Sequence, residues 1–546
     1  MKKCDTLILG NIYTLDTDST MVEAMAIKDG RVVYVGHEEV ARQLCDENTN
    51  VLDYKGKFVY PGFFDSHTHG LLAGQRLKFQ CDLKPGNSMQ DYVDIMKKYI
   101  EDNPGRRFYL GAGWIKYEEP TAAMLDSISK DIPIALNSAD GHSMWVNSAV
   151  LNECGIDANK VKEFGSDQIH ADENGNPTGL LCESASFIVN NKYTPSKEDI
   201  KEGLMAWQDF AFKNGITACV EALGDAYSEA GLEAYDELAK EGKLKLRTYA
   251  YTLNKKILMS SDLDTYMDTI KKQINNYNSE YFKVQGAKFL FDGVVEAHTA
   301  YLIDGYSDDP EYHGVNSCKG QEEFIKELIT TLNANDIPVH IHTIGDGAVR
   351  LANECLEKSA ITNLNFKVKN SLAHLQIVKP EDIKKVAEYG TIAVVAPLWV
   401  PVEKNYFIPE VEYLGEDRAY NSYPIKSFCD NGATICYHTD YPVTAIVNYP
   451  KTFYIASKRR DPEKGAKSFK NPDESISQIR SLLAVTCNGA YMVDEQDNLG
   501  KLLPGMIADC TVFDIDMLDP DIEKVSHSKL VATIIDGKVV YDSSNN

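Results

Sequence analysis

The sequence lacks several features that mark particular classes of protein. No apolar run approaches the roughly 18 residues of a membrane-spanning helix, and no C-x-x-C pair occurs among the twelve cysteines. After the basic start Met1-Lys2-Lys3, the apolar stretch from Thr6 to Gly10 is too short for the core of a signal peptide. We therefore expect reduced thiols rather than a disulfide framework, a cytoplasmic location and no membrane partner.

Positive charge is also scarce. The 56 Lys and Arg residues stand against 81 Asp and Glu residues, which gives a net charge of −25 over 546 residues. Such a surface repels nucleic acid and anionic membranes, so a small molecule is the expected partner. Hydrophobic residues make up 43% and charged residues 25%, as in ordinary globular proteins, which excludes a disordered chain. A homodimer is expected by analogy only.

The signatures of several enzyme classes are missing. The chain has no G-x-S-x-G elbow, no H-E-x-x-H helix, no Walker A loop and no convincing dinucleotide fingerprint. This argues against serine hydrolases, H-E-x-x-H metalloproteases, kinases and Rossmann oxidoreductases.

Two similar segments stand at opposite ends of the chain. Residues 26–35 and 533–541 each read as strand, Asp-Gly turn, strand. Asp-Gly between apolar runs is a strong hairpin signal, because a type I′ turn needs two positive φ angles. The two hairpins are either unrelated or parts of one domain. We favour one small β-sandwich domain built from residues 1–57 and 490–546.

Between these ends, strands alternate with helices, a pattern typical of a parallel sheet. The eight predicted strands fit a closed (β/α)8 TIM-like barrel over residues 58–489. The gap after the first strand is too long for one crossover, so we expect an inserted subdomain at about residues 75–210. The predicted strands are Phe58–Asp65, Ile216–Glu221, Lys245–Thr252, Lys283–Phe291, Ile337–His342, Ser371–Leu375, Thr391–Pro397 and Ala433–Thr439.

Residues suited to metals stand at the ends of these strands. In a barrel, the carboxyl ends of the strands form the rim where catalytic residues gather. Four histidines and one aspartate at four separate strand ends make coincidence improbable, and such a set suits Zn²⁺, with Mn²⁺, Fe²⁺ and Co²⁺ as alternatives. These candidates are His67, His69, His342, His374 and Asp440.

Each candidate has a plainer alternative. A lone buried histidine is more often a hydrogen-bonded core residue than a ligand, and for His374 alone we would prefer that role. We keep the structural role for His340, which lies deeper than His342 on the same face. For Lys288, in the fourth strand, the residues alone favour a partner to an acidic group.

The motifs together resemble the amidohydrolase superfamily. The later ones narrow the resemblance to the amidohydrolase-3 branch, which includes N-substituted formamide deformylases and related metal-dependent hydrolases. The resemblance covers essentially the whole chain. It rests on Pro61–His69, Asp140–Ser148, Pro177–Glu183, Lys288–Gly293, His342–Asp346, His374–Gln376 and Gly500–Asp509.

This resemblance implies a binuclear site and a hydrolase of an amide-like C–N bond, of the N-acyl or N-formyl amine type. One divalent ion, most suitably Zn²⁺, would be held by His67, His69 and Asp440. The other would be held by His342 and His374. Lys288 would bridge both as a carbamate. Asp440 would also act as the general base and then the general acid.

The resemblance further implies residues around the substrate. His142, in the inserted segment, is either a donor to the oxyanion and substrate or a loop residue that fixes the following helix. Glu183 either lines the pocket or has a structural role. His298 stands where many relatives carry Arg, and Trp399 is a candidate pocket wall. Asp292 is expected to support Lys288.

The last barrel strand departs from the pattern of many relatives. They read Gly-Ser-Asp-Trp-Pro-Val where this chain reads His438-Thr439-Asp440-Tyr441-Pro442-Val443. The departure leaves the specificity open. An ester, a cyclic amide or an amidine-type bond is the alternative substrate, and a non-catalytic binding protein on the same scaffold is the alternative from another class.

Overall fold

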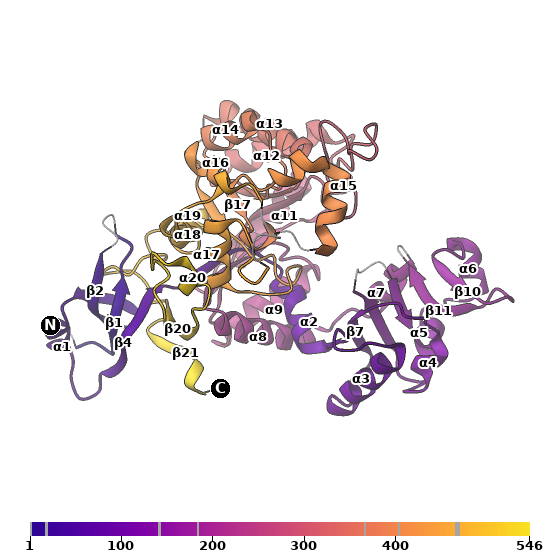
Figure 1. The fold of residues 1–546 in the computed structure, drawn as a ribbon, viewed down its shortest axis with the longest axis horizontal. Coiled ribbons are helices and arrows are strands. Elements are labelled where there is room, and N and C mark those ends of the chain that lie inside the picture. Colours follow the sequence, from indigo (N-terminus) through magenta and orange to yellow (C-terminus); the bar gives the residue numbers. More distant parts are fainter. Residues whose placement is uncertain are drawn as a thin grey trace. The chain divides into compact units, whose positions relative to one another are not determined.

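The computed structural model describes residues 3–16, 20–139, 143–182, 185–364, 367–401, 404–464 and 470–545. The chain divides into two compact units (Figure 1). The first unit joins Met1–Gly70 to Gln208–Asn546, and the second comprises Leu71–Trp207. The first unit holds a terminal sheet and a barrel.

Both ends of the chain build one seven-stranded sheet with the order β21-β20-β19-β4-β1-β2-β3. Strands β1 and β4 run parallel, and the other neighbours are antiparallel. The strands are β1 (Thr6–Tyr13), β2 (Met21–Lys28), β3 (Arg31–Gly36), β4 (Asn50–Pro61), β19 (Cys510–Phe513), β20 (Leu530–Ile535) and β21 (Lys538–Asp542). Short helices α1 (Glu38–Arg42) and α20 (Ile522–Val525) accompany them.

The two Asp-Gly turns have the predicted geometry. φ is 50° at Asp29 and 75° at Gly30, and 50° at Asp536 and 72° at Gly537, as type I′ turns require. The hairpin tips meet, because a Cβ built on Gly30 would lie 3.1 Å from Cβ of Asp536. Strands from both termini therefore share one hydrophobic core beneath this sheet.

The barrel is an eight-stranded parallel sheet with the order β18-β17-β16-β15-β14-β13-β12-β5. Side chains from several of its strands, among them Phe64, Val220, Tyr251 and Val394, fill the interior. This confirms the predicted barrel. The strands are β5 (Phe63–Thr68), β12 (Ile216–Glu221), β13 (Arg247–Thr252), β14 (Phe282–Leu290), β15 (Val339–Thr343), β16 (Ser371–His374), β17 (Ile392–Val395) and β18 (Ile435–Tyr437).

The first barrel strand begins later than predicted. Residues 58–61 belong to β4 of the terminal sheet, and β5 starts at Phe63. Gly62 separates the two strands at a close approach, because a Cβ there would lie 2.0 Å from Oγ1 of Thr217. One continuous apolar run thus serves two sheets.

Amphipathic helices follow the barrel strands. In α12 the buried residues Ile325, Leu328, Ile329 and Leu332 recur at helical spacing and form one apolar face. The helices are α9 (Glu229–Lys240), α10 (Lys255–Ser260), α11 (Leu263–Asn276), α12 (Glu322–Ala334), α13 (Asp346–Asn363), α14 (Pro380–Glu388), α15 (Lys404–Tyr420), α16 (Ile425–Asp430), α17 (Tyr449–Lys458), α18 (Gln478–Ala484) and α19 (Cys487–Met492).

The second unit has a six-stranded sheet of its own, with the order β10-β11-β9-β8-β7-β6. Trp114 and Trp145 are buried in its core, and their ring centres lie 6.2 Å apart. Its strands are β6 (Gln80–Asp82), β7 (Tyr109–Trp114), β8 (Ile134–Ser138), β9 (Ser143–Val146), β10 (Ile169–Ala171) and β11 (Pro177–Cys182). Its helices are α2 (Gly70–Phe79), α3 (Met89–Asp102), α4 (Ala122–Asp126), α5 (Ser148–Glu153), α6 (Ala158–Phe164) and α7 (Ser186–Lys192). Helix α8 (Lys197–Lys213) begins in this unit and continues past its last residue, Trp207.

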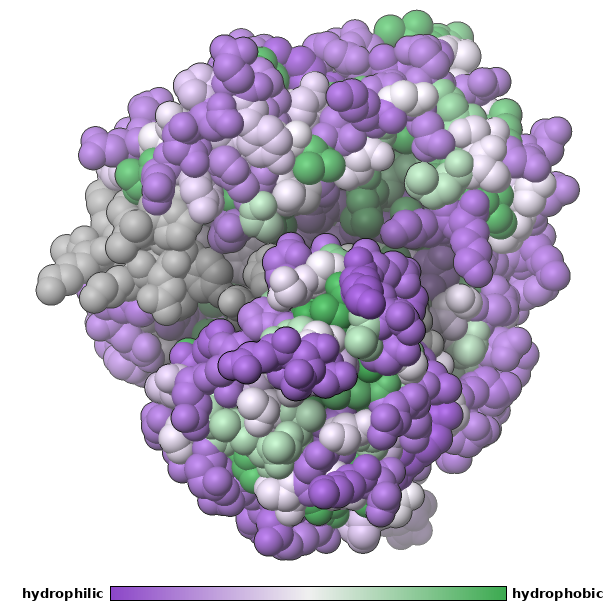
Figure 2. Space-filling view, turned by 90° about the vertical axis from the view of Figure 1, so that its right-hand side faces the viewer, coloured by the Kyte–Doolittle hydropathy of each residue, from purple (hydrophilic) through white to green (hydrophobic). Residues whose placement is uncertain are grey.

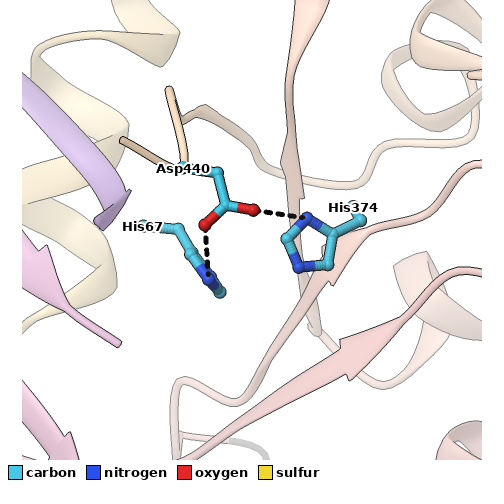
Figure 3. A group of neighbouring side chains, drawn as sticks. All are labelled: His67, His374 and Asp440. Carbon is cyan, nitrogen blue, oxygen red and sulfur yellow. Dashed lines mark ion pairs between the residues drawn. The ribbon is translucent and has the colours of Figure 1, made fainter. Parts of the chain in front are cut away.

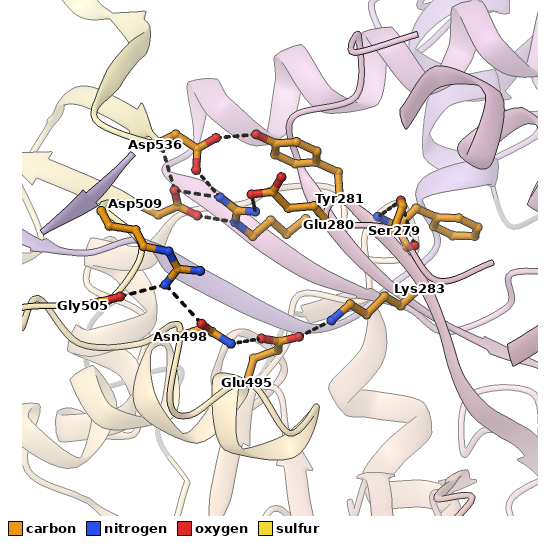
Figure 4. A network of polar contacts seen from close by, with 12 residues as sticks. Ser279, Glu280, Tyr281, Lys283, Glu495, Asn498, Gly505, Asp509 and Asp536 are labelled. Carbon is orange, nitrogen blue, oxygen red and sulfur yellow. Dashed lines mark hydrogen bonds and ion pairs between the residues drawn. The ribbon is translucent and has the colours of Figure 1, made fainter. Parts of the chain in front are cut away.

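A polar network links the amino ends of barrel strands to the terminal sheet (Figure 4). The guanidinium of Arg247, only 1% exposed at the start of β13, donates through Nε to Oδ2 of Asp509 at 2.7 Å and also contacts Asp536. The hydroxyl of Tyr281 donates to Asp536, and Lys283 pairs with Glu495. Charged groups buried in pairs of this kind are costly to separate.

The protein surface carries mainly polar side chains on the face shown in Figure 2, where hydrophobic residues are interspersed in small areas. Within the described segments, we find no helix with the length and apolarity needed to cross a bilayer. All twelve cysteines are free thiols.

We expect Arg247→Met to lower the free energy of unfolding of the first unit by about 3–5 kcal/mol, because Asp509 would be left as an unpaired buried charge. Urea unfolding followed by fluorescence measures this change. Arg480→Met is the matched control, since the Arg480–Asp430 pair is solvent-exposed at 3.1 Å and should cost less than about 1 kcal/mol. Equal effects of the two substitutions would contradict this account of the network.

Candidate metal centre

The first and last barrel strands bring three of the predicted ligands together. His67 lies in β5, His69 follows it, and Asp440 follows β18. Oδ1 of Asp440 lies 3.1 Å from Nε2 of His69 and 3.5 Å from Nε2 of His67. His67 and Asp440 are 1% and 4% exposed, so this contact is shielded from solvent.

The seam that closes the barrel runs through the same residues. The amide of Asp440 donates to the carbonyl of His67 at 3.0 Å, and the amide of His69 donates to the carbonyl of Tyr441 at 2.9 Å. The buried carboxylate of Asp65 accepts from the amide of Thr439 at 3.0 Å and from its Oγ1 at 2.6 Å. Closure of the barrel therefore sets the position of Asp440 against the two histidines.

His374 and His342 approach from β16 and β15. Nδ1 of His374 lies 3.9 Å from Oδ2 of Asp440, and the His342 ring centre is 4.5 Å from that of His374. Ligand atoms of His67, His374 and Asp440 all lie within 4.8 Å of one another (Figure 3). Among the described residues, this group has the composition and spacing of a metal site.

Lys288 is the buried amine of the cluster. It is 1% exposed, and its Nζ has no hydrogen-bond partner among the described residues. Burial lowers the pKa of Lys288 to about 7. A large share of the side chain is therefore a neutral amine near neutral pH. The structure thus does not pair Lys288 with a hydrogen-bonded acidic group.

Three histidines of the cluster, His67, His342 and His374, have lowered pKa values. Burial, followed by the charge of Lys288, lowers the pKa of His342 to about 4. The same two causes hold the pKa of His67 well below its ordinary value, and burial does so for His374. Neutral imidazole is the form that binds metals.

Backbone strain coincides with the cluster. φ is 80° at His374, 52° at Leu375 and 55° at Asp440, all in the left-handed region. Each non-glycine residue in this region costs on the order of 1–3 kcal/mol, and such residues concentrate at functional sites.

His340 has the structural role expected of it. Its Nε2 lies 2.6 Å from Nδ1 of His67, and its Nδ1 lies 2.7 Å from Oγ of Ser371. These two hydrogen bonds fix the orientation of the His67 ring and leave Nε2 of His67 facing Asp440.

Asp292 organises the loops beside the cluster. Its carboxylate accepts from the amides of Ile344 at 3.0 Å, Gly345 at 2.7 Å and Tyr301 at 3.0 Å. The following carbonyl, of Gly293, is 3.0 Å from Nε2 of His342. Only glycine fits at 293, because a Cβ would lie 2.1 Å from Oγ1 of Thr299. This geometry orients His342.

The sequence prediction missed His438 as a member of the cluster. Its ring centre lies 5.0 Å from that of His374 and 5.3 Å from that of His67, and the residue is 3% exposed. Burial lowers the pKa of His438 to about 4. The period of two in extended chain would have found it, since His438 stands two residues before Asp440.

Trp399, the candidate pocket wall, packs against the cluster. Its ring stacks on His374 with centres 5.2 Å apart and planes 10° apart, and its Nε1 donates to Oγ1 of Thr444 at 2.6 Å. Trp399 therefore forms an aromatic wall beside the cluster.

His298 is held elsewhere by its own contacts. Its Nε2 lies 3.0 Å from Oδ1 of Asp308. Its ring centre lies 4.0 Å from that of Tyr306 and 4.4 Å from that of Tyr413. The structure gives it no contact with the metal-site residues in the described part of the chain. His142 and Glu183, the other predicted substrate-binding residues, lie outside the described residues.

Comparison with known proteins assigns the chain to a family. The model of the amidohydrolase family designated Amidohydro_3 matches residues 50–541. The chain belongs to the amidohydrolase family. It is therefore a hydrolase of the metal-dependent amidohydrolase class.

Individual relatives match over nearly the whole length. Protein LONG AFTER FAR-RED 3 of Arabidopsis thaliana is 27% identical, covering 97% of this chain and 90% of its own. N-substituted formamide deformylase of Arthrobacter pascens is 24% identical, covering 99% and 98%. The crystal structure of an uncharacterized metal-dependent hydrolase from Pyrococcus furiosus matches with a TM-score of 0.77 at 24% identity, covering 94% and 100%.

We expect Thr439→Val to lower the free energy of unfolding by about 1–3 kcal/mol, because the substitution removes a donor from the buried carboxylate of Asp65. Thr439→Ser keeps the hydroxyl and is the matched control. Thermal unfolding of both variants compares them. If Val and Ser were equally tolerated, the hydroxyl would not hold the seam.

Proposed function

We propose that the cluster binds two divalent metal ions, most suitably Zn²⁺, and hydrolyses an amide-like C–N bond. His67, His69 and Asp440 would hold one ion, and His342 and His374 the other, with Lys288 between them. The observation that carries the proposal is the burial of several neutral imidazoles and one amine around a single carboxylate.

Unsatisfied polar atoms in the cluster fit this assignment. Within the described part of the chain, Nζ of Lys288 and Nδ1 of His69 and His374 are buried and have no hydrogen-bond partner. Each such atom costs about 1–3 kcal/mol when it stays unpaired. Nitrogen donors with one carboxylate are the ligand set that Zn²⁺ prefers, so bound ions would offset this cost.

Lys288 would act as a carbamate. The neutral amine attacks CO2, a new N–C bond forms, and the nitrogen releases one proton. The product is an anion whose oxygens can serve as ligands. The low pKa that burial gives Lys288, about 7, supplies the neutral amine that this reaction needs.

Asp440 is the proton carrier in the proposed reaction. Bound divalent ions would supply Lewis acidity and an ionised water near neutral pH. Burial raises the pKa of Asp440, but the hydrogen bond from His69 and the positive charges of His69, His438 and Lys288 together outweigh burial, and the pKa stays below the ordinary value. The carboxyl group is therefore ionised near neutral pH, which is the form that can accept a proton and then pass it to the leaving nitrogen.

The N-acyl or N-formyl amine class is proposed because the full-length relative from Arthrobacter pascens is named an N-substituted formamide deformylase. Trp399 offers an apolar wall for the substrate. His142 is proposed as a donor to the oxyanion, and Glu183 and His298 as substrate-binding residues.

Metal content tests the site. We expect about two ions per wild-type chain after reconstitution with Zn²⁺ and bicarbonate, and a clear loss in Lys288→Ala. Lys283→Ala is the control, because Lys283 lies in the same strand but pairs with Glu495. Plasma mass spectrometry measures both. A wild-type chain that retains no metal would overturn the proposal, and equal metal content in the two variants would remove Lys288 from the site.

Turnover tests the chemistry. Asp440→Asn should keep the fold and lose at least about a hundredfold in kcat, since proton transfer contributes that much. The assay uses matched N-formyl amines, N-acyl amines and the corresponding esters. If only the esters were hydrolysed, the proposed bond would be an ester rather than an amide-like C–N bond. Near-normal turnover by Asp440→Asn would exclude Asp440 as the proton carrier.

A further inference from the structure

His438 is the buried residue of the cluster that the proposed ligand set leaves unused. It directly follows β18, and its amide donates to the carbonyl of Val395 at 3.1 Å. Its ring lies among those of His67 at 5.3 Å, His374 at 5.0 Å and Trp399 at 5.5 Å, measured between ring centres.

Both ring nitrogens of His438 are buried and lack a hydrogen-bond partner among the described residues. Histidines with a purely structural role are hydrogen-bonded, as His340 is to His67 and Ser371. The two ring nitrogens of His438 therefore need a hydrogen-bond donor, a hydrogen-bond acceptor or a metal ion that the described residues do not supply. Because the His438 ring packs against the proposed ligands His67 and His374, this partner must lie within the cluster.

We propose that His438 is an additional metal ligand, which donates one ring nitrogen at the point where His67, His374 and Asp440 converge. This inference rests on the proposed metal site and deepens it. The ligand atoms of these three residues already lie within 4.8 Å of one another, and the His438 ring packs against those of both His67 and His374, so one of its nitrogens can complete the coordination of either proposed ion. A further imidazole at the site favours Zn²⁺ and Co²⁺ over Mn²⁺.

The aromatic surroundings hold His438 in place for this role. Trp399 meets the His438 ring at 83° and stacks on His374 at 10°, so it contacts both imidazoles. The indole is itself fixed by its hydrogen bond to Thr444. The neighbours thus restrict the ring through packing without using either of its nitrogens.

The test compares His438→Phe and His438→Gln with the full-length wild type. Phe keeps a ring of similar size and removes both nitrogens, whereas Gln keeps polarity. The probes are Zn²⁺, in competition with a chelator, and Co²⁺, through its visible absorption. We expect both variants to bind Zn²⁺ at least about tenfold more weakly and to change the Co²⁺ spectrum. His313→Gln is the control, because His313 bonds to the carbonyl of Leu302.

X-ray absorption of the wild-type Zn²⁺ form counts coordinated imidazoles directly and does not depend on whether the variants fold. Unchanged affinity and an unchanged spectrum in folded variants would overturn the inference and leave the proposed hydrolase site intact, even if KM shifted. A wild type that binds neither ion would overturn both. Weaker Zn²⁺ binding with an altered spectrum in both variants would support His438 as a ligand.

Discussion

Closure of the barrel between its first and last strands is the constraint on which the site depends. Asp440 has its position because its amide bonds to the carbonyl of His67, and Thr439 is held by the buried carboxylate of Asp65. The hydrogen bonds that join the chain at the ends of the first and last strands thus bring one carboxylate against His67 and His69. The scaffold and the chemistry share one set of contacts.

Burial then decides the charge state of this cluster. Lys288, His342 and His438 all have pKa values lowered mainly by the loss of solvent. Neutral nitrogens that are buried without partners are unfavourable in a protein interior unless something binds them. Strained backbone at His374 and Asp440 adds to this cost. A cation bound by these nitrogens would offset part of this cost, so the cluster favours cation binding.

The sequence predicted the barrel well because the signals are local. Buried parallel strands are continuous apolar runs, and helices such as α12 carry a clear period. The start of β5 was misplaced because residues 58–65 form one apolar run that serves two sheets. The spacing of His438 and Asp440 was visible in the sequence, but two features depend on tertiary contacts. These are the pairing of His298 with Asp308 and the lack of a hydrogen-bond partner for the His438 ring among the described residues. The full set of predicted ligands, with Lys288 among them, depended on family resemblance.

The measurement that tests the central claim most directly is anomalous diffraction at the zinc edge from crystals of the metal-loaded protein. The account predicts strong density enclosed by His67, His374 and Asp440, with His438 and Lys288 adjacent. Anomalous density only at surface sites, with the cluster filled by ordered water, would contradict it.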